Sequence, residues 1–187
     1  FINCMNRVVI TGIGIISCLG NNKNEVLASL LGSKSGLTLN PEYKENGMRC
    51  HISGQVNPNL DVIDRKMLRF MSETSAYAFL STEEALADSG LGIEDINNDT
   101  TGVIVGSGTG SSRELKNVVD TAREKGIKRV GPYAVTRTMG NTTSAAISTF
   151  FQTKGVSFSI ASACSTSLHC ISSVSYTHLT LPTTIEV

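Results

Sequence analysis

The chain has 187 residues, and its sixteen basic and sixteen acidic side chains cancel to a formal net charge of zero. This balance gives no electrostatic reason to expect a polyanionic partner such as nucleic acid. A chain of this length forms one large domain or two small ones, and it can bury roughly 70% of its unfolded surface without disulfide support. No stretch approaches the roughly 18 apolar residues that a membrane-spanning helix needs.

The cysteines are odd in number and widely spread, and no CxxC pair occurs among them: Cys4, Cys18, Cys50, Cys164 and Cys170. This spacing supports neither a zinc site nor a redox dithiol, so we expect no metal. Reduced thiols in a cytoplasmic protein are the simplest interpretation. The N-terminus lacks the basic region and cleavage site of a signal peptide. Because a β-rich run follows Met5 closely, we interpret residues 1–4 as upstream translation.

The first half of the chain begins with a β-rich run at 7–11 that predicts a strand. Residues 24–31 place apolar side chains on one face of a predicted helix, with Asn22 or Asn24 as its cap. Residues 32–62 have little periodicity and predict loops with short strands. A helical pattern then occupies 63–88, with a glycine stop at position 90.

The second half alternates strands and helices. A nearly all-apolar strand is predicted at 101–105, buried on both faces, and a glycine-rich turn leads from it into a helix at 113–125. A small-residue helix at 141–151 precedes a further strand. Because the crossovers are long enough for parallel pairing, this order predicts a layered α/β fold with a mixed, mainly parallel sheet.

A cysteine embedded in small residues ends the last predicted strand, in the run VSFSIASACSTS at 156–167. Such a string suits a sharp strand-to-helix turn on which a nucleophile must stand. The thiol of Cys164 would face the free N–H groups and the positive end of the following helix, which favour thiolate over thiol. The alternative is a buried cysteine that fills space.

Two glycine-rich turns resemble incomplete nucleotide motifs. Gly12-Ile13-Gly14 has Ser17 where GxGxxG needs its third glycine, and the 106–110 turn lacks the Gly-Lys-Ser/Thr of a phosphate loop. We therefore interpret both as tight packing turns.

The three histidines are weak candidates for a base beside Cys164. His169 lies five positions on, roughly 140° around a helix at about 100° per residue, and so points away from the thiol. His51 falls in a predicted loop, and His178 falls in the C-terminal tail.

Residues 5 to about 172 resemble the N-terminal half of the β-ketoacyl-acyl carrier protein synthases, most closely the bacterial type I enzymes. The matching segments are collinear: Arg7–Gly14 (RVVITGIG), Asn21–Leu30 (NNKNEVLASL), Ile63–Leu80 (IDRKMLRFMSETSAYAFL), Gly131–Thr136 (GPYAVT) and Ala161–Ile171 (ASACSTSLHCI). The resemblance implies one half of a thiolase-like fold, which is built from two duplicated α/β halves and forms a homodimer.

The resemblance implies that Cys164 accepts an acyl chain from acyl carrier protein as a thioester. A malonyl-carrier unit is then decarboxylated, and its carbanion attacks that thioester to extend the chain by two carbons, without a cofactor. The backbone N–H of Cys164 would form half of the oxyanion hole. Thiolases share the fold and a cysteine at this turn, but their cysteine context differs. Non-catalytic partner subunits usually lack the cysteine.

The resemblance also assigns weaker roles to other residues. It places Lys66 and Arg69 where type I synthases dock the acidic carrier protein, and Lys125 and Lys128 extend that patch. It places Met139 at a position contributed across the dimer interface to the acyl pocket. The alternatives are a solvated basic helix face and ordinary packing.

In the same scheme Thr109 gates the acyl pocket. The family's two catalytic histidines and its structural lysine lie in a C-terminal half that this sequence does not contain, so we expect no condensation by this chain alone.

The last residues depart from the family pattern. Threonines and Pro182 stand where the cysteine helix would continue, and both disfavour a helix. We therefore expect one domain at 5–172 and interpret 173–187 as a non-native tail that arises from read-through, a frameshift or sequencing adapter.

Overall fold

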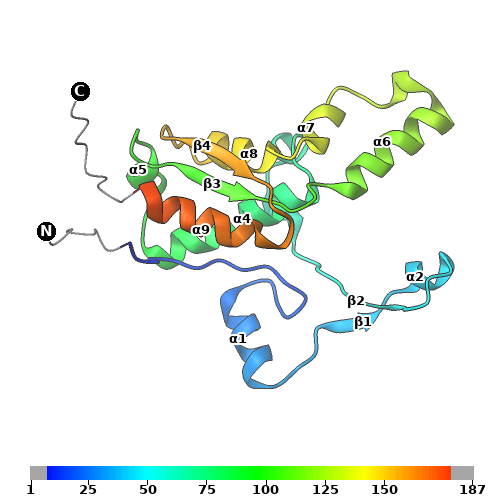
Figure 1. Ribbon diagram of the computed structural model, residues 1–187, viewed down its shortest axis with the longest axis horizontal. Helices are drawn as coiled ribbons and strands as arrows, with labels where there is room; N and C mark the ends of the chain where they lie inside the picture. The colour runs from blue at the N-terminus through cyan, green and yellow to red at the C-terminus, as the bar shows by residue number, and fades with distance from the viewer. Residues whose placement is uncertain (1–7, 178–187) are drawn as a thin grey trace, which may run out of the picture.

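The computed structural model describes residues 8–177, and the fold is a layered α/β arrangement built on a pair of parallel strands (Figure 1). β3 (Val103–Gly106) pairs with β4 (Ser157–Ile160), from Val103 opposite Ser157 to Gly106 opposite Ile160. α9 (Thr166–Thr177) packs on the strands from one side and α8 (Thr142–Phe150) from the other, with α4 (Glu73–Ser89) behind α8. The predicted α/β class is confirmed.

The strand predicted at 101–105 forms, shifted to β3, but it is half-buried rather than fully buried on both faces. The chain returns from β3 to β4 through α6 (Ser112–Lys125), α7 (Ala134–Thr138) and α8. This crossover places the ends of β3 and β4 at the same edge of the sheet, as parallel pairing requires. The turns that follow the two strands therefore meet.

The hydrophobic core lies mainly between α4 and α8. Its buried apolar residues are Ile63, Met71, Ala76, Phe79, Ile96, Ala146, Ile147 and Phe151. Phe79 of α4 stacks on Phe151 with ring centroids 5.0 Å apart and meets Phe150 edge-on at 6.1 Å. Such aromatic pairs add to the free energy gained by burying their apolar surface.

The predicted helix at 63–88 is divided in the structure. A short α3 (Arg65–Leu68) is followed by its cap residue Arg69. α4 begins after Ser72, whose hydroxyl accepts a hydrogen bond from the Ser75 amide. The predicted stop at Gly90 is confirmed, because Gly90 adopts a left-handed φ of 75° and caps α4.

The predicted strand at 7–11 is wrong for the residues that the structure describes, because 8–11 form no strand. The chain instead runs along α4, where the Ile13 amide donates to Asp88 and the Ile15 amide to Glu84, at 3.0 and 2.9 Å. Lys23 also pairs with Asp88, and its hydrogen bond, together with that from Ile13, lowers the pKa of the Asp88 carboxyl. Carboxylates of α4 thus accept the amide hydrogen bonds that a neighbouring strand would otherwise accept.

An arm extends from this layered body (Figure 1). It holds α1 (Lys23–Leu31), capped by Asn22 as predicted, and an antiparallel pair of short strands, β1 (Leu37–Leu39) and β2 (Ile52–Gly54). The predicted apolar face of α1 is largely exposed, since Val26 is its one buried residue.

The remaining short elements are α2 (Pro41–Glu45), α5 (Ile93–Ile96) and 3-10 turns at Leu60–Val62, Ile127–Arg129 and Ala163–Ser165. Within residues 8–177, none of the helices has the length and apolar character needed to cross a membrane.

Candidate active site at the Cys164 turn

Cys164 stands on a tight turn between β4 and α9, as its sequence context predicts. A 3-10 turn at Ala163–Ser165 leads directly into the helix. Ala163 adopts a left-handed φ of 48°, which is unfavourable for a residue with a Cβ and costs roughly 1–2 kcal/mol. A strained residue immediately before an exposed thiol is typical of a nucleophile held on a turn.

The glycine loop, which comprises residues 106–110 at the end of β3, packs closely against this turn. A Cβ on Gly106 would collide with the carbonyl oxygen of Ile160 and stand 2.7 Å from Cγ2 of Thr166. Gly108 approaches the backbone of Ala163 in the same way. Likewise, Cβ atoms on Gly12 and Gly14 would collide with backbone carbonyls of α4. These four close approaches to backbone support the interpretation of both glycine-rich segments as packing turns.

Cys164 and Cys170 lie on the same strand-turn-helix unit but in opposite environments. The Cys164 thiol is exposed just before the N-terminal end of α9. Cys170 is buried, and this burial raises the pKa of its thiol. Cys164 is therefore the accessible thiol of this unit and Cys170 a packing residue.

The backbone amide of Cys164 is available for an incoming group. Within residues 8–177, no group accepts a hydrogen bond from this N–H. Because α9 follows immediately, the amide adds to the unpaired donors that every helix N-terminus carries. Such a donor can stabilise the oxyanion that forms when a thiolate attacks a carbonyl.

Neither His51 nor His169 forms a hydrogen bond with Cys164 in the described part of the chain. Nδ1 of His169 lies 2.8 Å from Oγ of Ser162, on the exposed side of the turn, so this ring nitrogen is engaged with Ser162. His51 lies beside β2, where its carbonyl accepts a hydrogen bond from the Asn40 amide at 2.7 Å. His178 lies outside the described residues. The described part of the chain therefore places no imidazole as a base on Cys164.

Thr109 and Met139 line two neighbouring cavities. Thr109 is exposed beside a cavity of about 390 Å³ between the glycine loop and residues 159–161, which lead into the Cys164 turn. Met139 lines a second cavity, of about 340 Å³. Asn141 borders both cavities. Thr109 thus lies across a cavity from the residues that lead into the Cys164 turn, and Met139 lines the neighbouring cavity.

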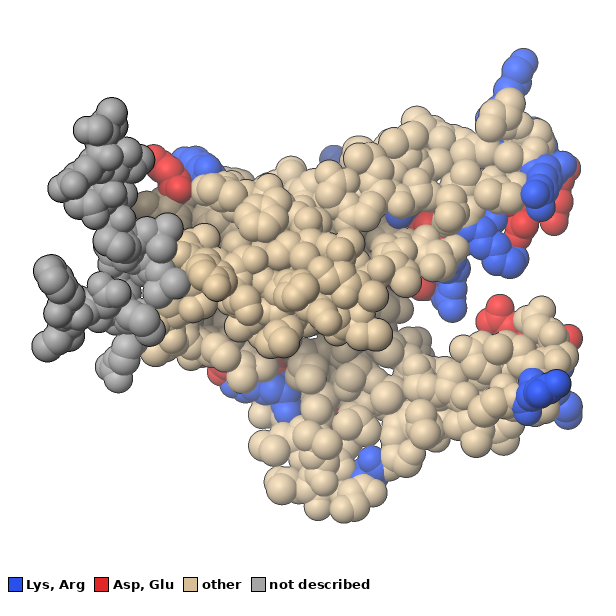
Figure 2. All heavy atoms as spheres, viewed as in Figure 1, with Lys and Arg blue, Asp and Glu red and all other residues tan. Residues whose placement is uncertain are grey.

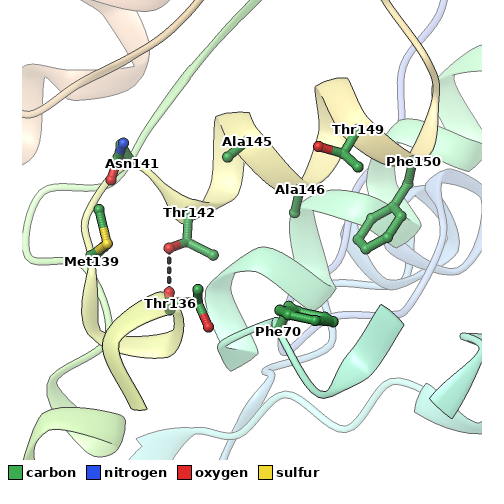
Figure 3. Close-up of a pocket in the computed structure, with 9 residues that line it drawn as sticks. All are labelled: Phe70, Thr136, Met139, Asn141, Thr142, Ala145, Ala146, Thr149 and Phe150. Atoms are coloured by element: carbon green, nitrogen blue, oxygen red, sulfur yellow. Dashed lines mark hydrogen bonds between the residues drawn. The ribbon is translucent and has the colours of Figure 1, made fainter. Parts of the chain in front are cut away.

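The cavity beside Met139 is largely apolar (Figure 3). It is lined by Phe70, Thr136, Met139, Asn141, Thr142, Ala145, Ala146, Thr149 and Phe150. The Thr142 hydroxyl donates a hydrogen bond to the Thr136 carbonyl, which ties the start of α8 to α7. Sequence reasoning missed Asn141 and Thr142, because small polar residues at a helix start normally indicate capping.

The four basic residues predicted to dock a partner are exposed but divided between two regions of the chain. Lys66 and Arg69 lie on and directly after α3, whereas Lys125 and Lys128 lie at the end of α6 and in the next 3-10 turn. Arg137 links these regions, since its Nε donates to the Arg69 carbonyl at 3.0 Å and its guanidinium lies 3.8 Å from Glu114 of α6.

Charged side chains gather at the end of the molecule where α6 lies, and the face over α9 and β4 is largely uncharged (Figure 2). Over the described stretch 8–177, no cluster of three or more histidine, cysteine or acidic side chains could hold a metal ion. The turn therefore offers an exposed thiol and a free amide. The cavity that Thr109 lines borders the residues leading into the turn, and it shares Asn141 with the apolar cavity beside Met139.

Comparison with known proteins agrees with this geometry. The family model described as "Beta-ketoacyl synthase, N-terminal domain" matches residues 5–180 of this chain. The chain is 51% identical over 170 residues to 3-oxoacyl-[acyl-carrier-protein] synthase 1 of Escherichia coli K12 and 49% identical to that of Haemophilus influenzae. Each match covers 89% of this chain and 42% of the relative.

A solved structure shows the same likeness. The crystal structure of a β-ketoacyl synthase from Burkholderia phymatum superposes with a TM-score of 0.77 at 26% identity, covering 92% of this chain and 43% of that one. The fold is thus that of the thiolase-like ketosynthases. The chain belongs to the β-ketoacyl synthase family, and it spans less than half the length of the relatives it matches.

Proposed function

We propose that this chain carries the acyl-accepting part of a β-ketoacyl-acyl carrier protein synthase, with Cys164 as the nucleophile. The observation that carries the proposal is the position of Cys164, exposed after a left-handed Ala163 at the start of α9, within the matched family domain. The thiolate is the reactive form of a cysteine, and the exposed position of Cys164 leaves its sulfur open to an incoming thioester.

The proposed step is a thioester exchange. The Cys164 thiolate attacks the carbonyl carbon of an acyl-carrier thioester, and the Cys164 amide stabilises the oxyanion that forms. The intermediate then collapses, the bond to the carrier's sulfur breaks, and the carrier leaves as a thiolate that takes up a proton. The acyl chain remains on Cys164 as a new thioester, with no change in oxidation state.

The condensation that follows in the family requires more than this chain supplies. Loss of CO₂ from a malonyl unit generates a carbanion, which attacks the Cys164 thioester and releases the thiolate. The resemblance places the family's assisting histidines in a C-terminal half, and this chain covers 42% of the length of its relatives. We therefore propose that the present chain accepts an acyl group but does not condense it.

The remaining assignments follow from the same proposal. Lys66, Arg69, Lys125 and Lys128 would dock the acidic carrier, and Thr109 and Met139 would border the path of the acyl chain. We also propose a cytoplasmic homodimer, in line with the family. Leu168 and Ile171 of α9 are about two-thirds exposed, which supports further protein packing on this helix in the complete enzyme.

Labelling with a cerulenin-like, cysteine-directed inhibitor tests the nucleophile. Mass spectrometry of the digested protein should place the adduct on Cys164, and Cys164→Ala should abolish it. Cys50 is also an exposed free cysteine, so Cys50→Ala is the matched control and should label like the parent. Labelling that persists in Cys164→Ala would remove Cys164 from this role.

A further inference from the structure

Thr166 is buried beneath the Cys164 turn, at the first position of α9, and is 4% exposed. Its hydroxyl accepts a hydrogen bond from the Ser162 amide at 2.9 Å and donates one to the Ala163 carbonyl at 2.8 Å. The Thr166 backbone amide donates to the same carbonyl. One side chain therefore binds both residues that precede Cys164.

The methyl group of Thr166 is held from the opposite side. A Cβ on Gly106, the last residue of β3, would stand 2.7 Å from Cγ2 of Thr166. The side chain is thus wedged between the end of β3 and the turn, with its hydroxyl toward the turn. Because χ1 of threonine is restricted, this contact keeps the hydroxyl within reach of the Ser162 amide and the Ala163 carbonyl.

The turn needs such a restraint, because Ala163 would otherwise relax from its left-handed conformation. Relaxation at Ala163 would rotate Cys164 relative to α9 and to the amides at its N-terminus. The hydrogen bond between His169 and Ser162 also touches the turn, but it lies on the exposed side, where water competes for both groups. The buried hydroxyl of Thr166 is the stronger restraint.

We propose that Thr166 is a positioning residue for Cys164, and that its hydroxyl fixes the direction of the Cys164 thiol and amide. This inference rests on the proposed role of Cys164 as the nucleophile. This role explains why a buried position carries a polar threonine rather than an apolar side chain. Valine, which matches threonine in shape but lacks the hydroxyl, is therefore predicted to fail, whereas serine is predicted to succeed.

Site-resolved alkylation by iodoacetamide tests this claim across a range of pH. Mass spectrometry gives the rates of Cys164 and of the exposed Cys50 in the same molecules, so the Cys164-to-Cys50 rate ratio is independent of protein concentration and reagent decay. Thr166→Val should lower this ratio roughly tenfold, the effect of losing a buried hydrogen-bonded group. Thr166→Ser should retain it within about threefold, and His169→Ala within about twofold.

Each outcome decides a separate point. If Thr166→Ser slows Cys164 as much as Thr166→Val, the methyl group is the determinant and the proposal fails. If circular dichroism shows that Thr166→Val does not fold, Thr166→Ala and Thr166→Ser form the decisive pair, since they differ in the hydroxyl alone. If Cys164 of the parent reacts no faster than Cys50, the proposed nucleophile itself fails. If Cys164 reacts faster than Cys50 and Thr166→Val leaves their rate ratio unchanged, only the positioning role of Thr166 is overturned.

Discussion

Gly108 and Ala163 are in direct backbone contact across the two turns that form the candidate site. A Cβ on Gly108 would stand 2.9 Å from the Ala163 carbonyl oxygen and 3.1 Å from its Cα. Both atoms belong to main chain, which cannot move aside as a flexible side chain would. The glycine loop after β3 therefore acts as a close-fitting support for the strained residue before Cys164.

Gly108→Ala should consequently destabilise the protein by about 1–3 kcal/mol, the usual effect of overpacking a close contact. Thermal unfolding followed by circular dichroism measures the change. Gly140→Ala is the matched control, because a Cβ there would meet nothing within 4 Å and its φ is not left-handed. We expect the control to unfold at or slightly above the parent temperature. Equal destabilisation by both variants would contradict the close fit.

A buried chain of hydroxyls joins α4 to α8. Oγ of Ser75, which is fully buried, lies 3.1 Å from Oγ of Ser72 and 3.1 Å from Oγ1 of Thr143. Ser75→Ala and Thr143→Val should each lower the free energy of unfolding by about 1–2 kcal/mol, since each leaves a partner unsatisfied.

The double variant should cost less than the sum of the two, because no unpaired hydroxyl then remains at this contact. Chemical denaturation of the four proteins gives the coupling free energy. Thr149→Val, an exposed position on the same helix, should be nearly neutral. Strict additivity of Ser75→Ala and Thr143→Val would show that their hydroxyls do not interact.

Cys170 should make stability depend on pH in the alkaline range. Burial raises the pKa of its thiol, so the unfolded chain ionises first as the pH rises. The stabilisation from this group is full below the ordinary thiol pKa of about 8.5 and is lost as the pH rises through the raised folded value.

Urea unfolding between neutral and alkaline pH measures this loss. We expect a shallower decline above about pH 8.5 in Cys170→Ala than in the parent, whatever its stability at neutral pH. Cys50→Ala, which changes an exposed thiol, should keep the parent's slope. Parallel slopes in the parent and Cys170→Ala would argue against the shift.

The features predicted well from sequence depend on local patterns. Small residues around Cys164 indicated the turn, and Gly90 marked the end of α4, because a sharp backbone needs particular residues wherever it occurs. The break after Arg69 was missed, since the apolar spacing continues across it. A one-turn helix followed by a new cap leaves nearly the same pattern as an unbroken helix.

Other features depend on residues distant in sequence. The β-rich run at 8–11 carries the composition of a strand, but pairing requires a partner that its own residues do not specify. The carboxylates of Glu84 and Asp88 bond the amides that follow this run instead. The role proposed for the Thr166 hydroxyl likewise depends on a contact with Gly106 of β3, which lies sixty residues earlier and cannot be predicted from the residues around Thr166.

The proposed carrier-docking residues can be tested by charge reversal. Lys66→Glu with Arg69→Glu should raise the KM for an acyl-carrier substrate several-fold in the acyl-transfer assay, with little change at saturating carrier. The effect should shrink at high salt, because exposed charges are screened. Lys34→Glu, an exposed site on the arm, serves as control. An equal rise in KM for the control would indicate net charge rather than docking.

Direct transfer of an acyl group tests the central claim. The protein is mixed with an octanoyl-carrier protein, and mass spectrometry then weighs the peptide that holds Cys164. The account predicts that this peptide gains one octanoyl group as a hydroxylamine-labile thioester, that one carrier thiol is released for each group gained, and that Cys164→Ala abolishes the transfer. An unacylated Cys164 in the folded protein, or equal acylation of Cys164→Ala, would contradict it.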